Sequence, residues 1–218
     1  MFSPQLSPDA ILFDDRADAG RQLAQLVLKE AQSLDASYIV YALPRGGVGI
    51  GAAIAEALHC PLDILVAKKI TRPQDPELAI GAVTADGQVL RSLNVRLSGW
   101  QEALERAQTK AKEQLEQFRD RPDVTASGKI AILVDDGIAT GMTISVAAKA
   151  LREQQPQEIW ICAPVAPAEL IKRLYEYGDR VLVLATPEPF FSVSRFYRSF
   201  PQVELESAIA DLKKTLQT

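Results

Sequence analysis

The sequence predicts an α/β fold: an open, mainly parallel β-sheet with helices on both faces. Three observations lead to this prediction. Short apolar runs alternate with segments of helical periodicity along most of the 218 residues. Residues 132–134 form an uninterrupted apolar run, as expected of a parallel strand covered on both faces. A turn rich in glycine and threonine then leads into a helix, and alternation of this kind is typical of a covered parallel sheet.

In the first part of the chain, apolar residues spaced three and four apart predict an amphipathic helix, which Asp14, Asp15 and Asp18 are placed to cap. Apolar runs that end at glycine or proline predict strands, and Asp86-Gly87 predicts the turn of a hairpin. The predicted elements are a helix at 17–34, a strand at 38–43, a helix at 49–58, a strand at 62–70, and a hairpin pairing 78–83 with 89–90.

In the second part, helical spacing over residues 99–119 predicts a long helix, within a helical insertion of about residues 95–122 that packs on the core. The charged residues of this helix are interpreted as a solvated face. The remaining predicted elements are a strand that ends at Val134, a helix at 141–154, a strand at 159–165, a helix at 167–176, a strand at 181–185 and a final helix from about Glu204. The whole chain, residues 1–218, is predicted to be a single domain.

The segment at 132–143 reads ILVDDGIATGMT and carries the strongest functional signal. Open α/β sheets bind ligands at the carboxyl ends of their strands, where this turn lies. Its glycines and the N-terminus of the following helix favour a phosphate. Asp135 and Asp136 would repel a phosphate, but carboxylates accept hydrogen bonds from vicinal ribose hydroxyls. The segment therefore predicts a site for a sugar phosphate.

A second constellation follows the strand at 38–43, where Arg45, Gly46 and Gly47 combine a guanidinium fork for phosphate oxygens with a flexible backbone. By itself, the glycine pair is also compatible with a tight turn of no further function. Residues 47–52 also satisfy the dinucleotide pattern G-x-G-x-x-A. A dinucleotide-binding oxidoreductase is less favoured, because the next strand ends at Lys68 and Lys69 without an acid, and because Asp135 and Asp136 would have no role.

The segment at 132–143 resembles the PRPP-binding motif of type I phosphoribosyltransferases, and the stretches at 42–58, 64–70, 76–87 and 190–200 extend the resemblance to a branch of predicted bacterial members. The resemblance implies transfer of the 5-phosphoribosyl group of PRPP to a nitrogenous base or similar acceptor, with release of pyrophosphate and dependence on Mg²⁺. It implies catalytic roles for Asp135, Asp136, Arg45 and Lys69, with the two acids acting on the metal indirectly, through ribose or water. The residues assigned to PRPP binding are Gly46, Gly47, Gly137, Ile138, Ala139, Thr140, Gly141 and Thr143.

The acceptor base is expected in a hood outside the regular strand–helix units. The candidate is the aromatic stretch at 187–201, in which Phe196 and Tyr197 are interpreted as base contacts. Phe190, Phe191 and Phe200 are interpreted as seating this stretch on the core. The identity of the base is not determined by the sequence.

Composition excludes several classes of protein. A net charge of -4 gives no sign of the basic surface that nucleic-acid binding requires. No apolar run approaches the length of a membrane span. We therefore expect a cytoplasmic protein whose partners are PRPP and a base, and we leave a homo-oligomeric state open. Cys60 and Cys162 are expected to be core residues, and His59 a helix-terminal one. The alternative to an enzyme is a regulator that senses PRPP or nucleotides on the same fold without catalysis.

Overall fold

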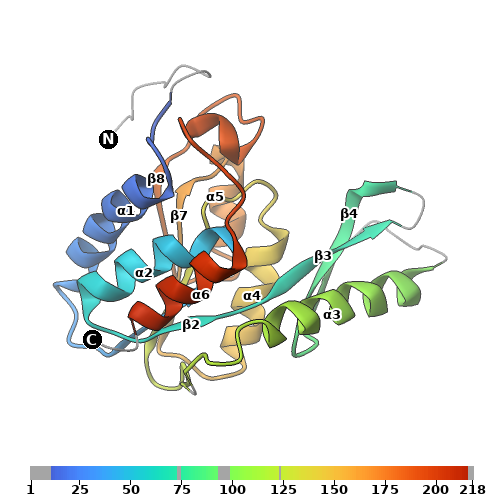
Figure 1. Cartoon of the computed structure of the whole chain (residues 1–218), viewed down its shortest axis with the longest axis horizontal. Helices are drawn as coiled ribbons and strands as arrows, with labels where there is room; N and C mark the ends of the chain where they lie inside the picture. Colours follow the sequence, from blue (N-terminus) through green and yellow to red (C-terminus); the bar gives the residue numbers. More distant parts are fainter. Residues whose placement is uncertain (1–10, 73–74, 93–98, 123, 216–218) are drawn as a thin grey trace.

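The computed structural model describes residues 11–72, 75–92, 99–122 and 124–215, and its centre is a parallel sheet of five strands in the order β2-β1-β6-β7-β8 (Figure 1). Every neighbouring pair in this sheet is parallel, so the carboxyl ends of all five strands lie at one edge. The strands are β1 (Tyr38–Ala42), β2 (Leu62–Ile64), β6 (Ile130–Val134), β7 (Glu158–Val165) and β8 (Arg180–Ala185). The predicted fold class is confirmed.

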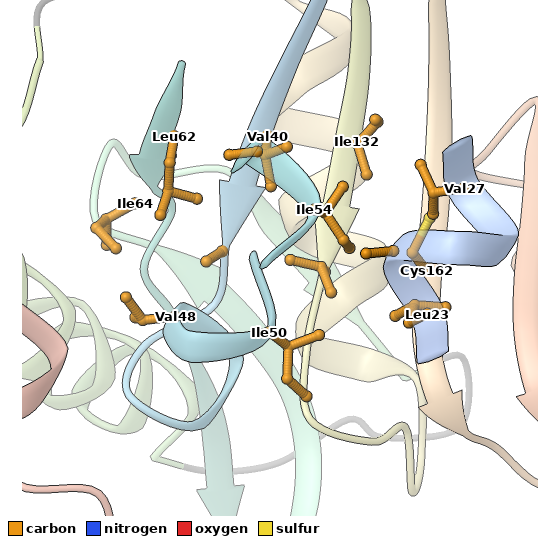
Figure 2. Packing of buried hydrophobic residues seen from close by; sticks show 14 of the residues in the cluster. Leu23, Val27, Val40, Val48, Ile50, Ile54, Leu62, Ile64, Ile132 and Cys162 are labelled. Carbon is orange, nitrogen blue, oxygen red and sulfur yellow. The ribbon is translucent and has the colours of Figure 1, made fainter. Parts of the chain in front are cut away.

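Helices cover both faces of the sheet. On one face lie α1 (Arg16–Ala31), α2 (Gly46–Leu58) and α6 (Leu205–Lys214), and on the other lie α4 (Met142–Arg152) and α5 (Ala168–Leu174). Alternate residues of each central strand face opposite cores, as the period of a strand requires. Figure 2 shows Ile54 of α2 beside Val40 and Ile132 on the first face, with Cys162 in the same cluster. Cys162 is thus a core residue, as expected.

A second sheet of three antiparallel strands, β3 (Ala67–Arg72), β4 (Asp75–Thr84) and β5 (Val89–Arg91), projects from the first (Figure 1). Its β4–β5 pair confirms the hairpin predicted around Asp86-Gly87. The single strand predicted over 62–70 is wrong, because it divides into β2 and β3. The backbone partner changes at this point: the N–H of Leu65 donates to Ala42 in the parallel sheet, whereas the carbonyl of Val66 accepts from Ala85.

The helix of the insertion predicted at about residues 95–122 is α3 (Trp100–Glu116), which packs along β3 and β4 through Ala103 and Ala107; residues 95–98 of the predicted insertion lie outside the described residues. Two local expectations are also confirmed. The side chain of Asp15 caps α1 by accepting a hydrogen bond from the N–H of Asp18, and His59 ends α2 in the left-handed conformation. After β8, the chain crosses the carboxyl edge of the sheet in an irregular tail that contains one short 3-10 helix, η1 (Val193–Phe196), and then enters α6.

Candidate functional site

The two acids predicted from the sequence follow β6 directly, at the carboxyl edge of the sheet. The backbone N–H of Asp136 donates to Oδ1 of Asp135 at 2.9 Å, which holds the two residues in a tight turn. Burial, and then the charge of Asp136, raise the pKa of Asp135 well above its ordinary value of 3.8. Burial also raises the pKa of Asp136, although the guanidinium of Arg16 opposes the rise. The site therefore holds two adjacent buried carboxyl groups that are costly to ionise in the absence of a ligand.

The loop at 44–47 touches this acid pair. A Cβ placed on Gly46 would collide with the carboxylate of Asp136, its Cγ lying 2.6 Å away. A Cβ on Gly47 would lie 2.8 Å from the carbonyl oxygen of Val134 and 3.1 Å from Cα of Asp135. A Cβ on Gly46 would meet the side chain of Asp136, and a Cβ on Gly47 would meet the backbone at the end of β6, so both glycines allow this loop to approach the acid pair closely. The structure brings together the two motifs that the sequence predicted separately.

The glycines of the dinucleotide pattern do not form a phosphate-binding turn. Residues 47–52 lie inside helix α2, which begins at Gly46, and buried Gly51 packs against Leu62 and Ala42. A dinucleotide fingerprint places its first glycines in the turn between strand and helix. The structure thus gives no support to the oxidoreductase alternative.

The turn after the acids leads into α4 and fits the predicted phosphate loop. Gly141 precedes the helix with φ of 73°, in the left-handed region that favours glycine, and no side chain of the described residues caps the N-terminus of α4. Ala139 and Thr140 are exposed and Thr143 is half-buried, so backbone and hydroxyl groups face solvent here. Ile138 differs and does not fit the predicted phosphate-binding role, because its side chain is buried in the core and its backbone N–H donates to the carbonyl oxygen of Val165 at 2.9 Å. An uncapped helix N-terminus with adjacent hydroxyls suits a phosphate dianion.

Arg45 lies immediately before α2, and its positive charge acts on Lys68. Lys68 is half-buried; burial lowers its pKa, and the charges of Arg45 and of Lys110 on α3 lower it further. Lys69 is exposed and belongs to the opposite face of β3. One signal in the sequence could have distinguished Lys68 from Lys69. Lys68 shares its face of the strand with Ile70, which is fully buried against α3.

Helix α3 contacts the loop at 44–47. The side-chain amide of Gln114 donates to the carbonyl oxygen of Pro44 at 3.3 Å, and its Oε1 is a buried oxygen without a hydrogen-bond partner among the described residues. Lys110 precedes Gln114 by four positions and so shares its face of the helix. Lys110 is exposed, as the interpretation of the α3 charges as a solvated face requires, and its charge also lowers the pKa of Lys68.

The expected base contacts in the tail are corrected by the structure. Phe196 and Tyr197 are only 1% and 5% exposed, so neither ring offers a free face to a heterocycle. Phe196 packs against Phe190, while Tyr197 packs between Phe13 and Phe200. The reason lies in the N-terminal segment, where the N–H groups of residues 12 and 13 donate to the carbonyl of Phe196 and bring Phe13 against the tail.

Phe191, which was expected to seat the tail on the core, is instead 65% exposed, and the guanidinium of Arg195 lies 5.0 Å from the centre of its ring. The same part of the tail lies against the phosphate loop. A Cβ on Gly137 would come within 2.7 Å of Cγ2 of Val193, so η1 sits directly on the first residue of that loop. The exposed ring of Phe191 therefore belongs to the segment that contacts the loop at 137–143 through Val193.

One member of the site was missed by sequence reasoning. Arg16, the first residue of α1, donates from Nε to Oδ2 of Asp136 at 2.7 Å, and both side chains are 16% exposed. It also borders a groove of about 1040 Å³ that runs along α2 and includes Gly46 and tail residues Pro201 and Gln202. No local pattern in the sequence relates Arg16 to Asp136, which is 120 positions away.

Two features of the described residues bear on the class of protein. No helix in the described ranges is both long and apolar enough to cross a membrane. No group of three or more histidine, cysteine, aspartate or glutamate side chains in the described part of the chain could enclose a metal ion. A cation at the acid pair would need most of its ligands from a substrate or from water.

A parallel sheet with paired acids after its central strand, an adjoining glycine loop and an uncapped helix N-terminus defines the type I phosphoribosyltransferase fold. The family model for the phosphoribosyl transferase domain matches residues 14–194, and the chain belongs to this family. It is 39% identical over 211 residues to a Mycobacterium tuberculosis (strain H37Rv) protein named "Putative phosphoribosyl transferase Rv0571c". That match covers 93% of this chain and 47% of the relative, so the chain spans about half the length of the curated relatives it matches first.

The chain is also similar to two further proteins. The crystal structure of TT1426 from Thermus thermophilus superposes with a TM-score of 0.77 at 30% identity, covering 93% of this chain and 98% of that one. A shorter match, 35% identical over 88 residues, joins 34% of this chain to 28% of ribose-phosphate pyrophosphokinase 1 from Listeria monocytogenes.

Proposed function

We propose that the protein transfers the 5-phosphoribosyl group of PRPP to a nitrogenous base or similar acceptor and releases pyrophosphate. The observation that carries the proposal is the contact of Gly46 with Asp136, because it joins two loops of different chemistry at one edge of the sheet. One loop offers carboxylates and a helix N-terminus, which suit the ribose hydroxyls and the 5'-phosphate. The other offers Arg45, whose charge acts on Lys68 as that of Lys110 does, and such cations suit a polyanionic leaving group.

In this reaction a nitrogen lone pair of the acceptor forms a bond to C1', and the bond between C1' and the pyrophosphate oxygen breaks. The electron pair leaves with the pyrophosphate, and the acceptor nitrogen loses its proton to solvent. Positive charge develops on the ribose ring while the leaving group gains negative charge. Asp135 and Asp136 would hold the ribose hydroxyls and offset the ring charge, and Arg45 with Lys68 would stabilise the pyrophosphate. The loop at 137–143 would anchor the remote phosphate and position the ring.

The residues fit magnesium as the metal. Mg²⁺ keeps several waters and is commonly held by one or two carboxylates together with substrate phosphates, which matches an isolated acid pair beside a phosphate site in the described part of the chain. Asp135 and Asp136 would act on the ion through ribose hydroxyls or bound water. When bound, the ion would neutralise charge on the pyrophosphate as the leaving group departs.

The acceptor would approach from the tail, where the ring of Phe191 is exposed next to η1. An exposed aromatic ring near the ribose can stack on a heterocycle. We propose Phe191 as a contact of the acceptor in place of Phe196 and Tyr197, whose burial excludes a stacking role.

The test is a screen for pyrophosphate release from Mg-PRPP with adenine, guanine, hypoxanthine, xanthine, uracil and orotate, accompanied by calorimetric titration of PRPP. The control is the Asp135→Asn, Asp136→Asn double variant, in which each lost charge-assisted hydrogen bond is expected to cost roughly 1.5 to 3 kcal/mol of PRPP affinity. Release with one base, lost in the double variant, supports the enzyme. PRPP binding without release from any acceptor would instead identify a sensor, and equal PRPP affinity in the folded double variant would refute the site.

A further inference from the structure

Arg16 joins three separate parts of the site through one guanidinium. Its Nε donates to Oδ2 of Asp136 at 2.7 Å, its Nη1 donates to the carbonyl oxygen of Pro201 at 2.7 Å, and its Cζ lies 3.6 Å from the centre of the Phe200 ring. The chain positions of these partners are far apart, so the contacts exist only in the folded protein. A planar fork that uses two different edges and one face is fixed in orientation as well as in place.

This geometry gives the two carboxylate oxygens of Asp136 different surroundings. Oδ2 lies between the guanidinium of Arg16 and the backbone at Gly46, where there is no room even for a Cβ. The hydrogen bond from Arg16 goes to Oδ2, so Oδ1 is left for a ligand or for the neighbouring carboxyl of Asp135. A carboxylate that is held on one oxygen cannot rotate freely, and its second oxygen then points in one direction.

We propose that Arg16 is a positioning residue that fixes the carboxylate of Asp136 for a ribose hydroxyl and links that carboxylate to the tail at Phe200 and Pro201. The inference rests on the proposed function, since it requires that Asp136 bind ribose. Arg16 does not itself touch the reacting atoms. A residue that only held the tail against α1 would make the same contacts with Phe200 and Pro201. The test must therefore separate orientation of the Asp136 carboxylate from attachment of the tail.

The test combines two double-mutant cycles on the full chain, each using Arg16→Ala, Asp136→Asn and the pair of changes together. The first cycle measures urea unfolding without ligand and asks whether the two residues are energetically coupled in the protein alone. The second measures the Kd of Mg-PRPP by calorimetry. Arg21→Ala is the matched control, because it removes another cation from the same helix, where Arg21 is exposed and forms its ion pair with Asp18.

In the wild-type background, we expect Arg16→Ala to weaken Mg-PRPP binding by about tenfold or more. This is the loss expected when one charged hydrogen bond, between Asp136 and a ribose hydroxyl, is no longer well oriented. In the Asp136→Asn background, the same change should weaken binding less than about twofold, because there is no carboxylate left to orient. Arg16→Lys keeps the charge but not the fork, and it should recover only part of the affinity. Arg21→Ala should bind PRPP as the wild type does.

Four results would overturn the proposal. An equal loss of PRPP affinity in both backgrounds would show that Arg16 acts by attaching the tail. Full recovery by Arg16→Lys would show that charge alone matters and that orientation does not. A wild-type protein that binds no PRPP, while the unfolding cycle still shows coupling, would refute the PRPP site and leave Arg16 as a structural ion-pair partner. Unfolding coupling with unchanged PRPP affinity in Arg16→Ala would refute positioning alone and leave the PRPP site standing.

Discussion

The phenolic oxygen of Tyr197 donates a 2.6 Å hydrogen bond to the backbone carbonyl of Asp136, which ties the tail to the turn that carries the acid pair. Burial raises the pKa of Tyr197 far above its ordinary value, and the nearby charge of Asp136 adds to the rise, so the phenol remains a hydrogen-bond donor at all ordinary pH. Tyr197, which the sequence suggested as a base contact, therefore helps to hold the turn that carries Asp135 and Asp136.

Tyr197→Phe should keep the ring packed against Phe13 and Phe200 while leaving the Asp136 carbonyl without its donor. We expect a loss of about 1 kcal/mol in the free energy of unfolding, measured by urea titration, with little change in the KM for the acceptor. Phe191→Ala should do the opposite, because its ring is exposed: stability within about 0.5 kcal/mol of wild type and a raised acceptor KM. A raised acceptor KM in Tyr197→Phe at unchanged stability would restore the base-contact interpretation.

Gly46→Ala should impair PRPP binding with little effect on folding. Its new methyl group must displace the carboxylate of Asp136, so we expect the Kd of Mg-PRPP to rise by about tenfold or more in calorimetry. Gly49→Ala is the matched control one turn along α2, because its Cβ would meet only the tip of Asp211 at 3.4 Å. That change should leave PRPP affinity unaltered and stabilise the helix by roughly 0.5 to 1 kcal/mol. Similar PRPP affinities in the two variants would contradict the close approach at Gly46.

Lys68→Ala and Lys69→Ala should separate a leaving-group residue from a surface charge. Because Lys68 lies in the field of Arg45, its removal should lower kcat on the order of tenfold or more, while binding of ribose 5-phosphate changes little. Lys69 is exposed on the other face of β3, and its removal should change neither quantity by more than about twofold. Steady-state kinetics with product inhibition measure both. A larger loss of kcat at Lys69 would return the role to the residue that the family resemblance favoured.

The acid pair should make the ligand-free protein less stable as pH rises. Asp135 has a raised pKa in the folded state, so the folded protein binds more protons than the unfolded chain once the pH exceeds the ordinary value of 3.8. Stability then falls with rising pH until the folded pKa is passed. Asp135→Asn removes this penalty and should raise the free energy of unfolding at neutral pH, with the gain disappearing below about pH 3.8.

Asp120→Asn supplies a control of opposite sign. A hydrogen bond from Lys213 and the charge of that lysine lower the pKa of Asp120, so its ionised form stabilises the folded state. Its replacement should therefore reduce stability at neutral pH and have no effect in acid. Urea unfolding over a pH series measures both variants. A neutral-pH loss of stability in Asp135→Asn would contradict the direction given for the acid pair.

Local patterns were sufficient for most of the framework. Helical spacing located α1 and α3, continuous apolar runs located β1, β6 and β7, and the turn residues Asp86-Gly87 located the β4–β5 hairpin. These features depend on residues close together in the chain, where propensity and periodicity act directly. The division of residues 62–70 into β2 and β3 was not predictable in the same way, because no turn residue separates the two halves and only their pairing partners differ.

The sequence by itself determined the α/β class, the acid pair and the loop at 137–143, since strand, carboxylates and helix N-terminus are contiguous there. Only the tertiary structure decided which distant side chains complete the site. The ion pair of Arg16 with Asp136, the half-buried position of Lys68 in the field of Arg45, and the burial of Tyr197 all depend on how separate elements pack. The sequence around an aromatic or cationic residue looks the same whether its side chain faces solvent or packs against a distant part of the chain. Its role is fixed by the contacts that packing supplies, and local periodicity does not encode these.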